Sequence, residues 1–199
     1  MASALHLDLS DDSDPDQIVT GYHGTVADRA SEIVATQRIE PSNNGYDWLG
    51  DGAYFWERSP LRASEWAERK GARDQVSVIK AKIRLGVCLD LVDSRYRGVV
   101  QEAQRRFQAR EIAAGRTAPV NKGKLARLDC AVFNYLCEIL DKPIDTIREV
   151  YAEGEPTYTG AALYGQSHIH LCVRNPACIL TLSIFDGPLA FPISEVVPT

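Results

Sequence analysis

The chain has 199 residues, of which 45% are hydrophobic, and its formal net charge is -5 at pH 7. One domain with a packed core is therefore expected, and disorder is excluded for the body of the chain. The acidic balance gives no broad electrostatic footprint for nucleic acid, and no apolar run approaches the roughly 18 residues of a membrane helix.

The first elements are predicted from local signals. Residues 1–15 contain an acidic Ser/Pro-rich run and are expected to form a mobile arm. A β-prone stretch follows at residues 18–22. Thr25 and Asp28 resemble a capping box, with Asp in place of Glu, and predict a helix that ends before Pro41.

The next segment alternates between loops, strands and one helix. Residues 42–51 are rich in Asn, Gly and Asp and indicate a loop, which leads into a short aromatic strand at 53–56. Ser59 and Pro60 form a helix start signal. Residues 76–91 alternate apolar with polar side chains, which predicts a strand with one wet face, or two strands broken at Gly86.

The second half begins with helices. Apolar side chains at helical spacing predict helices at 94–113 and from about 128 to 139, and a further short helix is expected at 144–148. Residues 114–124 between the two longer helices are basic and indicate a loop. We therefore predict a helical insertion at about residues 94–150.

The last elements are a loop at 153–165 and strands at 167–173 and 178–185. Because strands and helices do not alternate regularly, the expected class is α+β, and residues 16–199 are expected to form a single domain. Five widely spaced cysteines and the absence of a secretory pattern at the N-terminus favour a reducing cytoplasm, with most cysteines in the core.

Two short segments carry the residues of interest. His23 ends the first β-prone stretch and precedes Gly24, whose missing side chain allows a ligand to approach the backbone. Gly50 and Gly52 flank an Asp before Tyr54, which suits either a hairpin or a backbone that wraps a flat ligand against the tyrosine ring. Taken singly, each segment is more typical of an ordinary turn.

Together, residues 22–67 resemble the diphtheria-toxin and poly(ADP-ribose) polymerase class of NAD-using ADP-ribosyltransferases. That class shows a His-Gly-Ser/Thr strand end, an Arg-Ile-x-Pro-like segment, a Gly-x-Gly-x-Tyr-Phe stretch, and a helix with a small residue and an aromatic one. The counterparts here, in the same order and spacing, are His23-Gly24-Thr25, Arg38-Ile39-Glu40-Pro41, Gly50-Asp51-Gly52-Ala53-Tyr54-Phe55, and Ala63 to Trp66.

The resemblance implies two small packed β-sheets around an NAD cleft, with helices on the outer faces. It implies that His23 binds the adenosine ribose, that the backbone of Gly24 holds the nicotinamide carboxamide, and that Thr25 assists at the nicotinamide ribose. Arg38 would contact the adenosine half of NAD, and Gly52 belongs to the stretch that wraps the ligand.

Aromatic stacking on nicotinamide is the second implication. Tyr54 takes the place of the tyrosine that stacks on the ring. Trp66 lies one position beyond the place of a second stacking aromatic, where this sequence has Glu65. Each stacked face contributes about 1 kcal/mol.

The sequence departs from the class at His170, which aligns with a catalytic Glu. That Glu binds the ribose 2′-hydroxyl and stabilises an oxocarbenium-like transition state, whereas a neutral histidine supplies no negative charge. The change weakens the case for polymer formation more than for mono-transfer or NAD hydrolysis. His168 shares the strand face of His170. Glu153 or Glu155, in the preceding loop, could supply the carboxylate, or both could form a solvated acidic turn.

The function implied is a mono-ADP-ribosyltransferase that cleaves the nicotinamide–ribose bond of NAD. Protein, nucleic acid and small molecules all stay open as acceptors. By its resemblance, a bacterial toxin or defence effector with a neutralising partner protein is expected, without membrane contact.

Other functions stay open. The alternatives on the same fold are an NAD glycohydrolase and a catalytically dead module that binds NAD or ADP-ribose. A zinc site of His23, His168 and His170 is a further alternative, with less support. An RNA 2′-phosphotransferase would need an Arg/His pattern that this sequence lacks.

Overall fold

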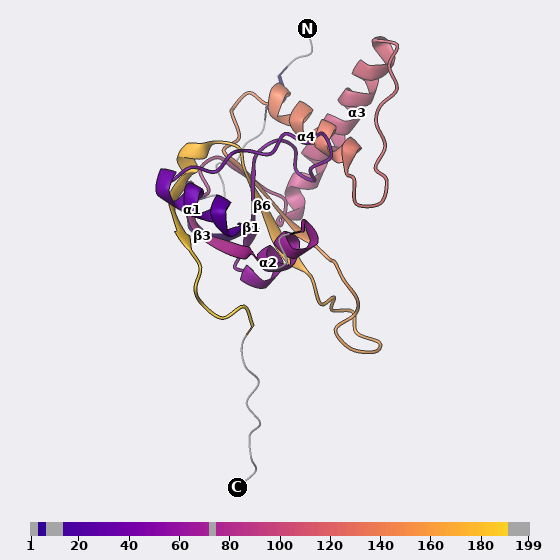
Figure 1. Ribbon diagram of the computed structural model, residues 1–199. Coiled ribbons are helices and arrows are strands. Elements are labelled where there is room, and N and C mark those ends of the chain that lie inside the picture. Colours follow the sequence, from indigo (N-terminus) through magenta and orange to yellow (C-terminus); the bar gives the residue numbers. More distant parts are fainter. Residues whose placement is uncertain (1–3, 7–13, 72–74, 191–199) are drawn as a thin grey trace.

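The computed structural model describes residues 4–6, 14–71 and 75–190 (Figure 1). Within these residues, seven strands form one mixed sheet in the order β4-β5-β6-β2-β1-β3-β7, accompanied by four α-helices. The strands are β1 Ile18–Val26, β2 Ala53–Glu57, β3 Val76–Arg84, β4 Cys88–Asp90, β5 Thr146–Tyr151, β6 His168–Val173 and β7 Ile179–Ile184. The helices are α1 Ala27–Thr36, α2 Pro60–Arg69, α3 Arg97–Ala113 and α4 Arg127–Ile139, with 3-10 turns η1 Ser94–Tyr96 and η2 Pro176–Cys178. The α+β class is thus confirmed.

The sheet is continuous, so the predicted pair of small sheets is wrong. The central strand β2 pairs with β6 along its whole length and also with β1, so its main-chain groups join the two halves. The joint to β1 is short, because these two described strands pair only at Gly21–Glu57 and Tyr22–Trp56.

The two faces of the sheet have separate cores, because successive side chains of a strand point to opposite faces. On one face, Phe55 packs with Ile33 of α1 and with Leu171 of β6. On the other face, Cys172 of β6 packs with Leu136 of α4. Each fully buried Leu, Ile or Phe stabilises the fold by about 1.5–3 kcal/mol relative to exposure.

The start of α1 differs from the prediction. Thr25 lies within β1 and is paired with Ser77, and α1 begins at Ala27 without a side-chain cap. The predicted capping box is therefore wrong, and the first strand is longer than predicted. The reason is that the β1–β3 ladder continues to the helix, where Ala27 N–H donates to the Gln75 carbonyl at 2.8 Å.

The end of the insertion also differs. The predicted short helix at 144–148 is wrong, because residues 146–148 belong to β5, which pairs with β4 in parallel and with β6 in antiparallel fashion, and residues 144 and 145 lead into that strand. Thr146 and Ile147 are fully buried there, and the Thr146 hydroxyl donates to the Leu85 carbonyl at 2.6 Å. The helical part of the predicted insertion thus ends at Ile139, and α3 and α4 pack side by side (Figure 1).

Other predictions are confirmed or fall outside the described residues. The break in the 76–91 stretch separates β3 from β4. Four of the five cysteines are buried, and all five are free. Of the predicted acidic arm, residues 1–3 and 7–13 lie outside the described residues, whereas Leu5 N–H donates to the Ile139 carbonyl at 2.7 Å. In the described part of the chain, no helix has the length and apolar character needed to cross a membrane.

Candidate functional site

His23 lies where β1 and β2 diverge. Its Nδ1 donates to the main-chain carbonyl of Tyr54 at 2.9 Å, which joins the two motifs singled out in the sequence. Burial lowers the pKa of His23 below its usual 6.5, so the ring is neutral at pH 7. Because Nδ1 carries the proton, Nε2 is left as an acceptor.

Gly24 faces the same gap with its backbone. Arg58 N–H donates to the Thr20 carbonyl, so the even-numbered residues of β1 direct their N–H and C=O groups toward β2. A continued ladder would pair Gly24 with Tyr54, but the Tyr54 carbonyl accepts from His23 instead. The main chain of Gly24 is therefore directed into an opening between two strands.

Close packing gives a second reason for glycine at this position. A Cβ on Gly24 would lie 1.8 Å from the main-chain oxygen of Ala63 in α2. A Cβ on Gly52 would lie 2.4 Å from the Cys172 sulfur. Gly52 also exchanges two main-chain hydrogen bonds with Ser42, at 2.8 and 2.9 Å, which close the loop between them. The Gly52 backbone groups are thus engaged within the protein.

Six rings gather on the sheet face opposite Phe55 and define an aromatic–histidine cluster: Trp48, Tyr54, Trp56, Tyr151, His168 and His170. The β2–β6 register places Trp56 beside His170, and their rings stack with centroids 5.2 Å apart. The centroid of the His170 ring lies 5.0 Å from that of Tyr54 and 5.3 Å from that of His168. The predicted residues Tyr54, His168 and His170 are therefore brought together.

The loop at residues 42–52 covers this cluster. The Tyr54 hydroxyl donates to the Gly50 carbonyl at 2.5 Å and accepts from Leu49 N–H at 2.9 Å. Burial raises the pKa of Tyr54, so the hydroxyl stays protonated. The centroid of the Trp48 ring lies 4.3 Å from that of Tyr151, and its Nε1 donates to the Lys124 carbonyl at 3.3 Å. The loop between α3 and α4 thus helps to hold Trp48 over the cluster.

Unpaired buried polar atoms concentrate at this cluster. Among the described residues, the buried side-chain nitrogen and oxygen atoms without a hydrogen-bond partner are Trp56 Nε1, Arg62 Nε, His168 Nε2 and both ring nitrogens of His170. Leaving one such group unsatisfied costs about 1–3 kcal/mol. Because buried polar groups in native proteins are nearly all paired, each exception needs an explanation.

The protonation states of the two histidines follow from their surroundings. Burial lowers the pKa of His170 to about 3, so the ring is neutral and has one donor and one acceptor nitrogen. Part of His170 reaches the surface, but both of its ring nitrogens are buried. Burial also lowers the pKa of His168, and its Nδ1 donates to the Gln166 carbonyl at 2.9 Å, which leaves Nε2 as an acceptor.

A buried arginine that the sequence reasoning missed lies beside the histidines. The Arg62 side chain is 6% exposed, and its guanidinium pairs with Glu65 and, at 2.6 Å, with Glu153. The nearer Glu153 oxygen is 4.0 Å from His168 Nδ1, and the Gln166 amide donates to Glu65 at 3.1 Å. The signal available in the sequence was an arginine next to Ala63, on the inner face of an amphipathic helix.

The remaining predicted residues lie at the margin. Trp66 is 40% exposed and contacts the cluster through Trp56, with ring centroids 5.8 Å apart. Arg38 is exposed in the turn after α1, and Thr25 is half-buried in β1. Within the described residues, no side-chain hydrogen bond or ion pair joins either of them to the aromatic–histidine cluster.

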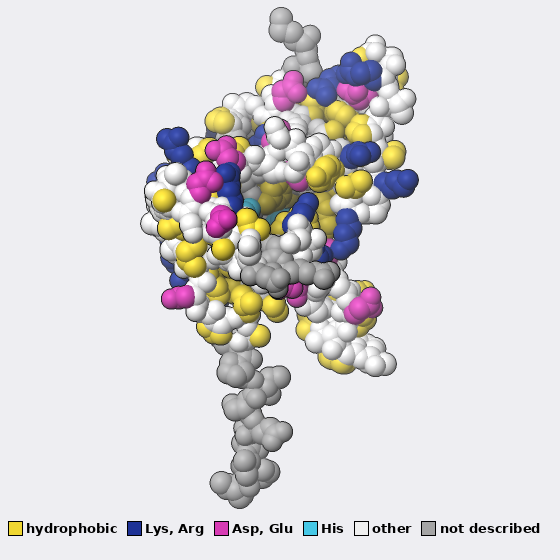
Figure 2. Space-filling view, in the orientation of Figure 1, with side chains coloured by type: hydrophobic (Ala, Val, Ile, Leu, Met, Phe, Trp, Pro, Cys, Tyr) yellow, Lys and Arg dark blue, Asp and Glu magenta, His cyan; other side chains and the backbone are white. Residues whose placement is uncertain are grey.

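Two cavities flank the cluster. One of about 540 Å³ is lined by Glu65, Glu68, Arg69 and Gln166, next to the Arg62 ion pairs. Another of about 580 Å³ lies between α3, α4 and β5 and reaches Tyr151. Figure 2 shows histidine atoms only in a small hollow at the centre of the visible face.

The arrangement does not fit the three-histidine zinc alternative. The His23 ring packs against Phe55, on the face of the sheet opposite Trp56, whereas His168 and His170 contact Trp56. In the described ranges, no group of three His, Cys, Asp or Glu side chains is placed to hold a metal ion.

Comparisons with known proteins give no information on the chemistry of this site. No family model matches the chain, and no solved structure matches it. The chain is 34% identical over 70 residues to an uncharacterized protein of Methanocaldococcus jannaschii. The matched segment covers 33% of this chain and 32% of that protein. The chain therefore spans about a third of the length of the curated relative it matches.

Proposed function

We propose that the aromatic–histidine cluster binds NAD, and that the protein is a mono-ADP-ribosyltransferase that cleaves the nicotinamide–ribose bond. The convergence of unpaired buried polar atoms at one place carries this proposal. They include donors, at Trp56 and Arg62, and an acceptor, at His168 Nε2. Ribose hydroxyls both donate and accept, so the two hydroxyls of one ribose match this mixed set.

The gap between β1 and β2 supports the nicotinamide half of the proposal. A primary carboxamide offers one acceptor and a donor group, and the C=O and N–H of Gly24 are directed into this gap. The Tyr54 ring and the indole of Trp48 provide flat surfaces near His170. A planar pyridinium ring between such faces gains about 1 kcal/mol per face from stacking.

The proposal requires Trp48 to move when NAD enters, because its ring lies against Tyr151 and His170. A loop that shifts on binding also excludes water from the reacting bond, which favours transfer to an acceptor over hydrolysis.

Binding is the first test. All three tryptophans of the chain, Trp48, Trp56 and Trp66, lie in or against the cluster, so their fluorescence should change saturably with NAD. His168→Ala should weaken the affinity about tenfold, the value of one lost hydrogen bond. His6→Ala is the control, because His6 is exposed and pairs with Asp141. If NAD causes no saturable change in the wild type, the proposal fails.

The second test follows the products. Wild-type protein is incubated with a cell extract and NAD labelled in its adenylate half, and nicotinamide release is measured alongside. Label on a macromolecule supports transfer, and label on free ADP-ribose alone indicates a glycohydrolase. Binding without nicotinamide release would favour a non-catalytic NAD-binding module. This module is the main competing function, because a neutral His170 stands at the position of the Glu of the resembled class.

A further inference from the structure

We infer that Glu153 supplies the carboxylate that stabilises positive charge on the ribose, in place of the Glu that the resembled class has at the position of His170. This inference rests on the proposed function and deepens it. Of the two acidic residues in the loop between β5 and β6, the geometry selects Glu153 and sets Glu155 aside.

Glu153 is next to two of the side chains that carry unpaired atoms. Its Oε2 is 2.6 Å from Arg62 Nη2 and 4.0 Å from His168 Nδ1. The His168 side chain is 1% exposed and that of Arg62 is 6% exposed, and each retains a buried nitrogen without a partner. A carboxylate therefore contacts one nitrogen of each of two buried side chains, and another nitrogen of each side chain has no partner.

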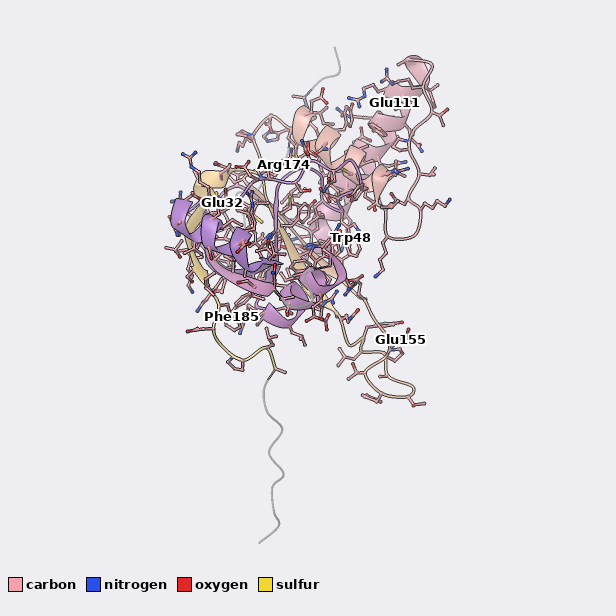
Figure 3. The ribbon with its side chains drawn as sticks, viewed as in Figure 1. Glu32, Trp48, Glu111, Glu155, Arg174 and Phe185 are labelled. Atoms are coloured by element: carbon pink, nitrogen blue, oxygen red, sulfur yellow. The ribbon has the colours of Figure 1, made fainter. Side chains whose placement is uncertain are left out.

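Main-chain hydrogen bonds hold Glu153 in this place. Gln166 N–H donates to the Glu153 carbonyl at 2.9 Å, and Gly165 N–H donates to the Glu155 carbonyl at 2.9 Å. The base of the loop is thus closed directly before β6. Glu155 is exposed, and it lies on the part of the loop that projects from the body of the protein (Figure 3).

The charge balance favours a cation at this site. One buried guanidinium, that of Arg62, faces the two carboxylates of Glu65 and Glu153. Among the described residues, the other cations paired with these carboxylates are Arg69 and Lys124, each 3.8 Å from a carboxylate, and their side chains are 37% and 71% exposed. The Glu65 and Glu153 side chains are 28% and 19% exposed, so solvent screens Lys124 strongly and Arg69 slightly more than the carboxylates, and the inner side of the site keeps a partial negative charge.

The step balances without any further reactant. The bond between C1′ of the ribose and the nicotinamide nitrogen breaks, and its electron pair leaves with neutral nicotinamide. The positive charge that develops on C1′ and the ring oxygen is stabilised by Glu153. A lone pair of the acceptor then forms the new bond to C1′, and the acceptor proton passes to solvent. Neutral His168 and His170 orient the ribose hydroxyls.

The test compares Glu153→Gln with Glu155→Gln in the full chain. Single-turnover nicotinamide release gives the rate of the chemical step, and tryptophan fluorescence gives the Kd for NAD. Glu153→Gln should lower the rate about 100-fold or more, which is typical of losing one transition-state electrostatic contact, and change Kd less than about threefold. Glu155→Gln should match the wild type in both. Glu153→Asp, which keeps the charge, should retain more activity than Glu153→Gln.

Each outcome decides between the two proposals. A Glu153→Gln rate within about threefold of the wild type overturns the role of Glu153 and leaves the NAD site intact. A second outcome is a Glu153→Gln variant whose lower rate is accompanied by a lower free energy of unfolding, with no recovery of either in Glu153→Asp. It would indicate a structural ion pair and would also overturn the role of Glu153. If the wild-type protein binds NAD but releases no nicotinamide, both the proposed enzymatic activity and the role of Glu153 are contradicted.

Discussion

At the scale of single residues, the main feature of the candidate site is a pair of neutral histidines, of which His168 is buried and His170 has both ring nitrogens buried. His170 is enclosed by the rings of Trp48, Tyr54, Trp56, Tyr151 and His168. Its two ring nitrogens have no partner in the described residues, so the folded protein retains a cost that a polar ligand would offset. Such local costs are typical of binding sites, where unliganded stability is lower than it could be.

The His170 pKa predicts a pH dependence of stability. The folded-state pKa is about 3 and the usual value is 6.5, so between these pH values the unfolded chain binds a proton that the folded protein does not. The stability is therefore fully present above pH 6.5 and falls as the pH drops toward 3, by about 1.4 kcal/mol per pH unit from this group.

Urea unfolding at pH 7, 5.5 and 4.5 measures this dependence. His170→Phe keeps a ring against Trp56 but cannot titrate, so its loss of stability between pH 7 and pH 4.5 should be smaller than that of the wild type. Identical slopes for the wild type and His170→Phe would show that His170 is not protonated on unfolding in this range.

At the scale of elements, the site depends on how β1 separates from β2. The two strands pair at Gly21 and Tyr22. At the next residue, the His23 ring donates a hydrogen bond to the Tyr54 carbonyl. The helix α2 packs so tightly on β1 that only glycine fits at position 24. The same helix carries Arg62, so this packing also places the guanidinium next to Glu153.

Gly24→Ala should therefore be strongly destabilising. Its Cβ would lie 1.8 Å from a main-chain oxygen of α2, which cannot move aside as a flexible side chain would. We expect a loss of about 3 kcal/mol, at the upper end for overpacking, or failure to fold. Gly45→Ala is the matched control, because a Cβ at Gly45 meets nothing within 4 Å. Thermal unfolding of both variants measures the difference, and similar midpoints would contradict the tight packing of α2 on β1.

At the scale of the whole molecule, one continuous sheet connects all the described elements. β2 lies at the centre and joins the half formed by β4, β5 and β6 to the half formed by β1, β3 and β7. The site lies at this joint, with His23 and Gly24 on one side and His168 and His170 on the other. The proposed binding surface thus depends on both halves being folded.

A single cooperative unfolding transition is expected from this connection. Far-ultraviolet circular dichroism reports on the helices and on both halves of the sheet, whereas the tryptophans report on the joint alone. The two probes should give the same urea midpoint, as in two-state unfolding. Separate midpoints would mean that the halves unfold independently and that the β1–β2 joint is too short to couple them.

The sequence by itself determined the elements whose signals are local. Apolar spacing predicted α3 and α4, Ser59 and Pro60 predicted the start of α2, and alternation predicted β3. These predictions succeed because a buried face repeats at the period of its own helix or strand.

Only the tertiary structure decided which distant segments pair. Residues 144–148 are in or next to a strand because β4 and β6 supply main-chain partners on both sides, and Thr25 is in a strand because β3 extends beside it. Arg62 meets Glu153 across 91 residues, and no pattern along the chain encodes that distance. Hydrogen bonds and ion pairs between remote segments depend on the assembled sheet, whereas periodicity reports only which face of each element is buried.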